Sequence, residues 1–208
     1  VLKSAGNKNT SNTSGSYNPG NNISSPGYAR NVVTVGGVTG SSTTSVSHAD
    51  GASYVNSDGN AKPNISAPFY VTNPHGNSGA GTSYSTPQVT GAVALLFQCH
   101  PYLSIYPEQT AAALEASSSH EILSDFSTGI ANHDKENGAG VLDVDCLLNS
   151  LTIADTHLNN NDKVKTNVLS LQVYLKAGQK IKINLYWLAR FNTSDDTLYY
   201  TDYDLRLT

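Results

Sequence analysis

Residues 81–97 constrain this chain more than any other stretch. They begin with Gly-Thr-Ser, continue through a proline one turn later, and end in a run rich in alanine, leucine and valine. This pattern predicts a loop that leads into a buried helix. Ser83 would then lie at the start of the helix, beside backbone N–H groups that the helix leaves unpaired. Because such groups can hold an oxyanion, Ser83 is a candidate nucleophile.

The same residues match a family signature. The stretch resembles the nucleophile motif of subtilisin-like serine proteases (subtilases), which usually reads Gly-Thr-Ser-Met-Ala-x-Pro-x-Val-x-Gly. The chain agrees with this motif at its fixed positions, which are Gly81, Thr82, Ser83, Pro87, Val89 and Gly91. It has Tyr84 for Met and Ser85 for Ala, and it has Gln88 and Thr90 where His and Ala are common in the family. The resemblance implies that Ser83 attacks peptide bonds in a protein or peptide substrate.

An asparagine near the start of the chain fits the same chemistry. Residues 1–4 are expected to end a strand, and Ala5-Gly6-Asn7 follows. In subtilases a buried strand ends in Ala-Gly-Asn, and the amide of that asparagine is the second oxyanion donor. The resemblance implies this role for Asn7, although a turn asparagine after glycine is otherwise common. It also implies that Ser4, Ala5 and Gly6 wall the pocket for the substrate side chain directly before the cleaved bond.

Other segments follow in the order of the family. Residues 28–38 are β-branched and bounded by glycine, which predicts a buried strand. Residues 43–50 are polar and alternating, and the resemblance implies a strand there. Residues 62–68 resemble the family segment Lys-Pro-Asp-Ile-x-Ala-Pro, and residues 137–144 resemble the segment that closes its catalytic domains. Residues 71–80 are a glycine-rich approach to the serine. Helices are predicted from Pro107 onward and around residues 146–148.

The resemblance implies an α/β fold with two parts. Residues 1–150 are expected to be the C-terminal half of a mainly parallel-sheet catalytic domain, with a boundary near Leu151. Beyond it the apolar residues alternate along residues 169–175 and 181–187, which predicts a hairpin with one buried face. This pattern resembles the β-sandwich (jelly-roll) domain that follows the catalytic domain in some subtilases. Residues 151–208 would be an incomplete part of such a domain.

Composition limits the classes of partner. The chain has 208 residues, of which 13% are charged, and its net charge is −4, so it offers no basic stripe for nucleic acid. It has no apolar stretch approaching the ~20 residues of a membrane span. The chain has no methionine and resembles a piece of a longer protein. The family resemblance implies a protein that is secreted or located at the cell envelope.

The other two members of a catalytic triad are missing. In subtilases the order is Asp, His, Asn and Ser, so the aspartate and histidine would precede Val1. The histidines in the chain lack the family's His-Gly-Thr context; they are His48, His75, His100, His120, His133 and His157. The chain alone is therefore expected to be inactive and poorly soluble, with the missing N-terminal half as its partner.

Metal and cysteine chemistry are less constrained. Catalysis of this kind needs no cofactor, and the resemblance allows a structural calcium ion. Asp202 and Asp204 carry suitable oxygens, but paired acids beside a strand are more often solvated, so no ligand is assigned. Two interpretations stay open for Cys99 and Cys146. They are either buried free thiols or a disulfide in a secreted protein.

Two further functional hypotheses compete with the protease. A catalytically inactive subtilase-fold protein could bind a partner protein as a scaffold, and the residues upstream of Val1 would distinguish the two. A hydrolase with a serine elbow is disfavoured, because the second glycine of Gly-x-Ser-x-Gly is replaced by Ser85.

Overall fold

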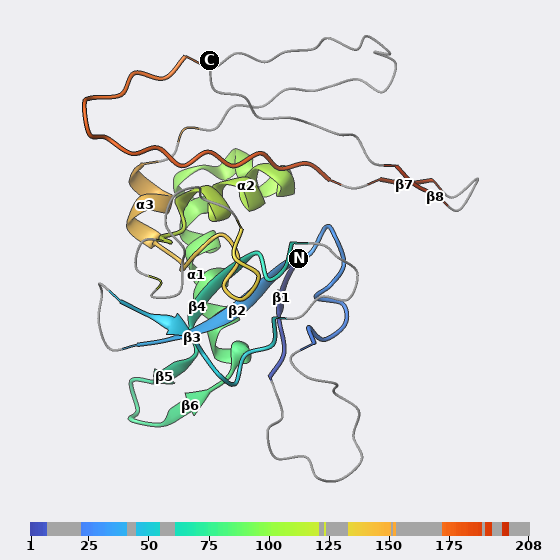
Figure 1. Ribbon diagram of the computed structural model, residues 1–208, viewed down its shortest axis with the longest axis vertical. Helices are drawn as coiled ribbons and strands as arrows, with labels where there is room; N and C mark the ends of the chain where they lie inside the picture. The colour runs from blue at the N-terminus through green and yellow to red at the C-terminus, as the bar shows by residue number, and fades with distance from the viewer. Residues whose placement is uncertain are drawn as a thin grey trace.

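A central buried strand organises the computed structural model. The structure describes residues 1–7, 22–40, 45–54, 61–120, 123, 133–150, 152, 172–188, 190–192 and 197–199. Strand β2 (Val33–Thr39) is buried over its first six residues. Strands β1 (Leu2–Ser4) and β4 (Ile65–Pro68) pair with it in parallel, and β3 (Ser47–His48) pairs with its end in antiparallel orientation. The sheet is therefore mixed, and the predicted α/β class is confirmed (Figure 1).

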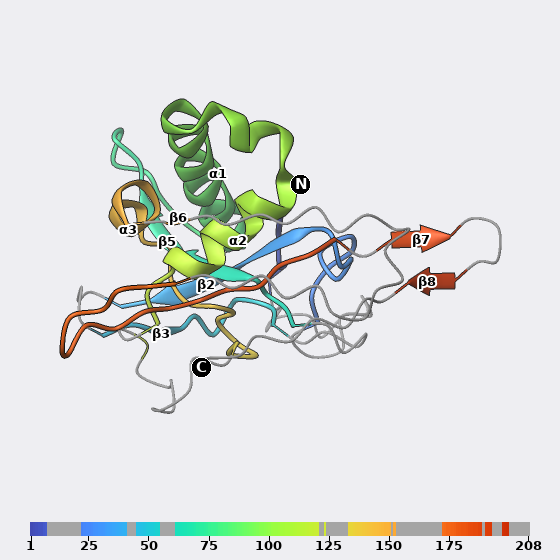
Figure 2. The ribbon, with the colours of Figure 1, turned by 90° about the horizontal axis from the view of Figure 1, so that it is seen from above.

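The helices pack together on the sheet. They are α1 (Thr82–Cys99), the 3₁₀ helix η1 (Pro101–Ile105), α2 (Pro107–Ser117) and α3 (Val144–Asn149). Val89 and Leu96 of α1 are fully buried and share one hydrophobic cluster with Val35 of β2 and Ile65 of β4. Figure 2 shows α1, α2 and α3 on the same side of β2. The strands therefore have a packed face beneath α1, which holds the start of that helix in place.

A short hairpin leads into α1. Strands β5 (Tyr70–Thr72) and β6 (Ser78–Ala80) pair in antiparallel orientation. The Asn73 side-chain oxygen accepts from the backbone N–H groups of His75 and Asn77, both at 3.0 Å, and Gly76 has a φ of 80°. The sequence indicated only a glycine-rich approach here. The two strands are too short to show a clear alternation of apolar and polar residues, and the turn is stabilised by a side chain, so the sequence did not predict the hairpin.

Several predicted elements are confirmed with shorter bounds. The helices α2 and α3 lie where the sequence predicted helices. The strand predicted over residues 28–38 begins only at Val33, because the preceding residues form turns closed by bonds such as Ala29 N–H to Pro26 O (3.0 Å). The strand predicted over residues 43–50 is confirmed only at Ser47–His48. Residues 41–44 and Leu151, the predicted boundary, lie outside the described residues.

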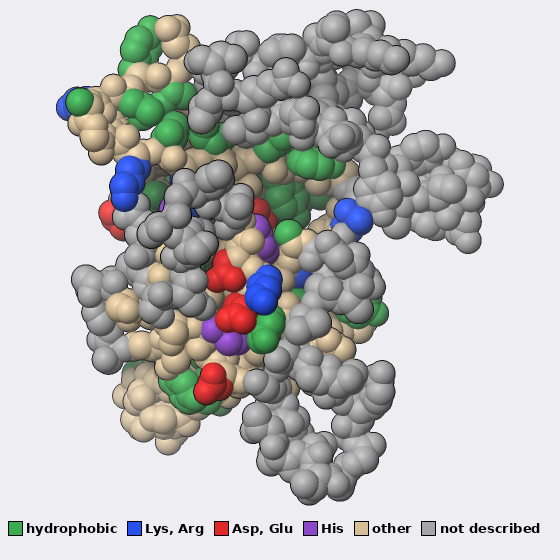
Figure 3. Space-filling model, viewed as in Figure 1, with side chains coloured by type: hydrophobic (Ala, Val, Ile, Leu, Met, Phe, Trp, Pro, Cys, Tyr) green, Lys and Arg blue, Asp and Glu red, His purple; other side chains and the backbone are tan. Residues whose placement is uncertain are grey.

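The predicted buried face of the C-terminal hairpin is wrong. A turn does form, closed by the Gln179 N–H to Lys176 O bond (2.9 Å), but the described residues 172–188 form no strand. The apolar residues point outward, with exposed fractions of 43% for Ile181 and 42% for Trp187. Hydrophobic side chains are visible on the surface of the molecule in Figure 3. The described strands beyond this segment are β7 (Arg190–Asn192) and β8 (Thr197–Tyr199), which pair antiparallel.

Polar contacts explain this reversed orientation. Lys182 donates to the carbonyl oxygens of Ser118 (2.8 Å) and Ala139 (2.6 Å), and Asn184 donates to a carboxylate oxygen of Glu115 (3.0 Å). These residues alternate with the apolar ones along the segment, so their inward orientation forces the apolar residues outward. Buried acceptors without donors would be costly, and this segment supplies the donors.

Glu115 is the centre of a buried polar cluster. Its other carboxylate oxygen accepts from Asn64 of the segment entering β4 (2.7 Å), and Asn64 in turn accepts from Lys62 (2.7 Å). Burial raises the pKa of Glu115, although the hydrogen bonds from both asparagines oppose this shift. Burial also lowers the pKa values of Lys62 and Lys182, each to about 8, against the attraction of Glu115. The carboxylate therefore compensates two buried ammonium groups.

The cysteines differ from the prediction. Both are free, but Cys99 is exposed and Cys146 is half-buried. The prediction of buried thiols is wrong for Cys99, because the last turn of α1 packs Leu96 against the sheet and leaves Cys99 on the solvent side.

The buried cluster predicts a pH-dependent effect of Glu115→Gln. The variant keeps the side-chain shape but leaves Lys62 and Lys182 without their counter-charge, so we expect a loss of roughly 2–4 kcal/mol of unfolding free energy at pH 6.5. The folded lysines have pKa values of about 8, below the ordinary 10.5. Above pH 8 they are already neutral in the folded protein, so the loss should shrink. Urea unfolding at pH 6.5 and pH 9.5 measures both effects.

Glu108→Gln is the matched control, because it removes a carboxylate from the first turn of the same helix. Its effect should stay below about 1 kcal/mol at both pH values. Equal losses for the two variants at pH 6.5 would contradict the compensating role of Glu115.

Candidate active site

Ser83 lies in the first turn of α1, where the helix begins at Thr82. Gly81 precedes the helix with a φ of 142°, and a Cβ there would lie 3.0 Å from the Asn7 side-chain nitrogen. The N–H groups of Tyr84 and Ser85 donate to the Gly81 carbonyl (2.9 and 3.3 Å). Within the described chain, no acceptor reaches the Ser83 N–H group. The predicted position of Ser83 at the helix start is confirmed, and its exposed side chain is accessible.

Asn7 lies beside this turn and is oriented by Thr82. Its Oδ1 atom accepts from the Thr82 backbone N–H (2.9 Å) and from the Thr82 hydroxyl (3.1 Å). The amide oxygen is therefore engaged, and the Nδ2 group is the side of the amide that remains to donate to another acceptor. This contact holds Asn7 beside the first turn of α1, although Asn7 and Thr82 are 75 residues apart in the sequence.

The three residues before Asn7 have different surroundings. Ser4 lines an open cavity together with Ser83. Ala5 is fully buried, and its backbone donates to Val35 O (2.8 Å) and accepts from Ser24 N–H (2.7 Å). Gly6 donates to the Thr82 hydroxyl (3.1 Å) and has a φ of 112°. Of the predicted pocket residues, only Ser4 lines this cavity, and the other two hold the strand end against its neighbours.

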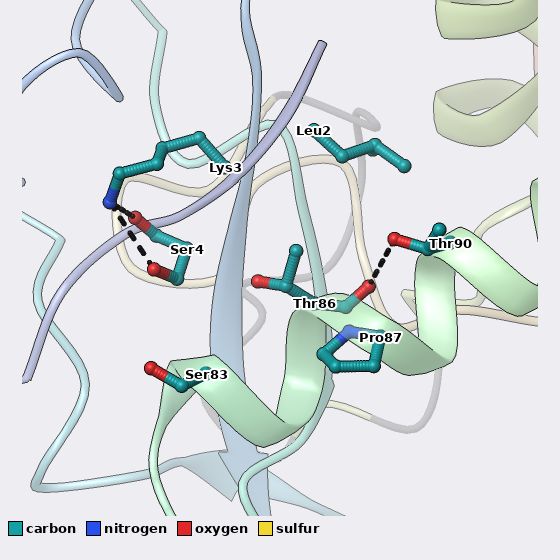
Figure 4. A pocket seen from close by; sticks show the side chains of 7 residues that line it. All are labelled: Leu2, Lys3, Ser4, Ser83, Thr86, Pro87 and Thr90. Atoms are coloured by element: carbon teal, nitrogen blue, oxygen red, sulfur yellow. Dashed lines mark hydrogen bonds between the residues drawn. The ribbon is translucent and has the colours of Figure 1, made fainter.

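The cavity beside Ser83 has a volume of about 510 Å³. It lies between β1 and α1, and its lining residues are Leu2, Lys3, Ser4, Ser83, Thr86, Pro87 and Thr90. Figure 4 shows Ser83 at the start of α1 and Lys3 and Ser4 on the strand across from it. A serine at a helix start, an oriented amide and an adjacent cavity together can bind and stabilise a developing oxyanion.

No candidate base lines this cavity in the described part of the chain. Five of the six histidines are described, and none is among the lining residues. His48, for example, interacts with the Ala52 carbonyl at 3.2 Å, and burial lowers the pKa of His133 to about 4. His157 lies outside the described residues. The sequence-based expectation that these histidines are structural or surface residues stays a prediction.

Two residues at the site were not identified from the sequence. Thr82 was noted only as a motif position, yet it binds both Asn7 and Gly6. Lys3 lines the cavity, and the only sequence signal for it was that it is the one charged residue in the predicted strand end, residues 1–4. Neither role is encoded in local spacing, because both depend on how β1 packs beside α1.

The described residues contain neither a candidate metal site nor a candidate membrane span. There, no three His, Cys, Asp or Glu side chains lie close enough to hold a metal ion. Asp202 and Asp204 lie outside those residues. In the same described part, no helix has the length and hydropathy to cross a membrane.

Comparison with known proteins gives a family-level match. The model of the subtilase family matches residues 1–164. No match was found among curated proteins.

Solved structures of proteases resemble the chain at the level of fold. MycP1 from Mycobacterium smegmatis is 20% identical with a TM-score of 0.50, and the match covers 80% of this chain and 45% of MycP1. Fervidolysin from Fervidobacterium pennivorans, a keratinolytic enzyme related to subtilisin, is 20% identical with a TM-score of 0.49, covering 71% of this chain and 22% of fervidolysin. The prenylagaramide maturation protease PagA is 21% identical with a TM-score of 0.45, covering 71% and 48%. The chain thus spans less than half of each.

Thr82→Val tests whether the hydroxyl orients Asn7. The change keeps the shape of a fully buried side chain but leaves Asn7 Oδ1 with one donor and leaves Gly6 N–H without its acceptor. We expect a loss of about 1–3 kcal/mol in unfolding free energy. The Asn7 side-chain amide should also exchange its protons faster, as measured by NMR.

Thr90→Val is the control, since the Thr90 hydroxyl only donates to the carbonyl one turn earlier on the same helix (3.0 Å). It should change neither quantity appreciably. Unchanged Asn7 exchange in Thr82→Val would show that the backbone N–H alone orients the amide.

Proposed function

The chain belongs to the subtilase family, and from this premise we propose that it carries the nucleophile half of a serine endopeptidase active site. The observation that carries the proposal is the 2.9 Å bond from Thr82 N–H to Asn7 Oδ1. Through this bond the Asn7 amide contacts the second residue of the family's nucleophile motif, directly before Ser83. A serine and an oxyanion donor in contact with one helix turn fit acyl transfer better than simple binding.

In the proposed reaction, the Ser83 hydroxyl oxygen attacks the carbonyl carbon of the scissile peptide bond. The hydroxyl proton passes to a histidine, and an aspartate orients that histidine. Both residues would be supplied from upstream of Val1. The histidine then returns the proton to the leaving amine, which departs as the acyl-enzyme on Ser83 forms. Water hydrolyses this ester by the same steps and regenerates the serine.

The negative charge that develops on the carbonyl oxygen needs donors that are already in place. The Ser83 backbone N–H and the Asn7 Nδ2 group are the two donors that we assign to it. The Ser83 N–H has no acceptor among the described residues, and the Asn7 amide oxygen is held by Thr82. Because both donors are oriented before substrate binds, little reorganisation is required when the charge forms. The start of α1 adds its positive dipole end to the same position.

The remaining features are assigned at the level of the family. We propose a secreted or cell-envelope protein that acts on proteins or peptides and needs no cofactor for catalysis. The upstream half of the catalytic domain is its structural partner, and residues 151–208 begin a β-sandwich domain. A structural calcium ion is compatible with this proposal, without assigned ligands. No nucleic acid and no membrane span are part of it.

Covalent labelling tests the nucleophile. A fluorophosphonate probe should label Ser83 in the full-length protein and should not label the Ser83→Ala variant, which should also lose peptide hydrolysis. Peptide mapping of the labelled protein identifies the modified residue. Folded wild-type protein that neither reacts with the probe nor cleaves peptides would favour the inactive scaffold instead.

Asn7→Ala tests the oxyanion donor. We expect kcat to fall by about 10²–10³-fold, the range known for removing an oxyanion donor in subtilisin itself, with KM nearly unchanged. Steady-state kinetics on one peptide measures both constants. Asn73→Ala is the control, because Asn73 stabilises the β5–β6 turn rather than the helix start. An unchanged kcat in Asn7→Ala would refute the assignment of Asn7.

A further inference from the structure

Lys3 places a positive charge at the wall of the cavity beside Ser83. It lies in the middle of β1 and pairs with Thr34 of β2 in the sheet. Of the seven residues that line the cavity, Lys3 alone is charged. A lysine within a parallel strand is unusual, because such strands are normally apolar on both faces. Its presence here is not needed to form the sheet.

The Lys3 ammonium group is held by neutral acceptors. It donates to the Ser4 carbonyl (2.8 Å), the Ser4 hydroxyl (3.2 Å) and the Ser24 hydroxyl (3.1 Å). The two hydroxyl contacts are longer than the 2.7–2.9 Å typical of an ammonium bonded to a carboxylate. The described residues provide no carboxylate for this group. The charge is therefore fixed in position and lacks an ionic partner among them.

Ser24 is itself fixed to the predicted pocket wall. Its backbone N–H donates to the Ala5 carbonyl (2.7 Å), and its hydroxyl approaches the same carbonyl (3.3 Å). A Cβ on Gly6 would lie 3.1 Å from the Ser24 hydroxyl oxygen, so this side chain packs directly against the glycine. Lys3, Ser4 and Ser24 thus form one hydrogen-bonded unit along the residues 4–6 wall. Of this unit, Lys3 and Ser4 line the cavity beside Ser83.

We propose that Lys3 makes the protease prefer substrates with an acidic side chain directly before the cleaved bond. The proposal rests on the proposed function, since it places that side chain in the cavity lined by Ser83, Lys3 and Ser4. An incoming carboxylate can replace the two long hydroxyl contacts with shorter, charge-assisted ones. In a half-buried site the new contacts are favourable. The ammonium would lose only bonds to neutral oxygens, because no carboxylate of the described chain is bonded to it. A neutral amide of the same shape gains much less.

Matched peptides measure this preference in the full-length protein. Two substrates that differ only in glutamate or glutamine before the cleaved bond should differ in kcat/KM by about 10- to 100-fold in favour of glutamate. The ratio should decrease as salt is raised, because it depends on a partly exposed charge pair. Lys3→Met should reduce the ratio to about one, and Lys3→Arg should retain most of it. Lys135→Met, which removes an exposed lysine elsewhere, should leave it unchanged.

The outcomes separate this inference from the proposed function. If the fluorophosphonate probe labels Ser83 but wild-type protein shows no salt-sensitive preference for glutamate, the role of Lys3 is overturned and the protease remains. The same conclusion follows if Lys3→Met is labelled normally and keeps the wild-type ratio. If Ser83 is never labelled and no peptide is cleaved, both proposals fail together. If Lys3→Met does not fold, the kcat/KM ratio of the wild-type protein and of Lys3→Arg tests the proposal instead.

Discussion

The contact between the end of β1 and the start of α1 is the constraint on which the site depends. Thr82 uses its backbone N–H and its hydroxyl on Asn7, and the same hydroxyl bonds to Gly6. Thr82 is fully buried, so these groups have no water to replace a lost partner. A glycine at position 81 is required as well, because any Cβ there would press against the Asn7 amide. The chemistry that we propose for Ser83 therefore depends on this contact between a strand end and a helix start.

The buried cluster around Glu115 connects other elements of the same fold. It connects α2 with the entry to β4 through Asn64 and with the C-terminal segment through Asn184. A buried carboxylate contributes little net stability, but it is costly to leave without its partners. We infer that the cluster specifies which face of residues 181–187 turns inward. The outward apolar face is then a consequence of polar pairing.

The sequence predicted the elements that depend on local pattern and failed where partners are distant. The helix after Ser83 and the helix from Pro107 follow from apolar periodicity and a helix-start proline. The position of Asn7 at a strand end was also predicted, through its resemblance to a family motif. The inward orientation of Lys182 was not, because alternation alone favoured burying Ile181 and Trp187. Its acceptors at Ser118 and Ala139 are 64 and 43 residues away, which no local pattern reveals.

Thr82 also connects the predicted pocket wall with the proposed oxyanion donor. Gly6 lies between Ala5 of the pocket wall and Asn7, the proposed oxyanion donor. Because the Thr82 hydroxyl bonds to Gly6 N–H and to Asn7 Oδ1, a shift of Gly6 would also disturb the Asn7 amide beside the first turn of α1. In the proposed site, a substrate held beside Gly6 would therefore meet an oxyanion donor that Thr82 has already oriented, so binding there can position the scissile carbonyl rather than the donor. In such a site, Lys3 is connected through Ser24 to Ala5, and Asn7 is connected through Thr82 to Gly6, so the proposed charge and the proposed donor are fixed on adjacent residues.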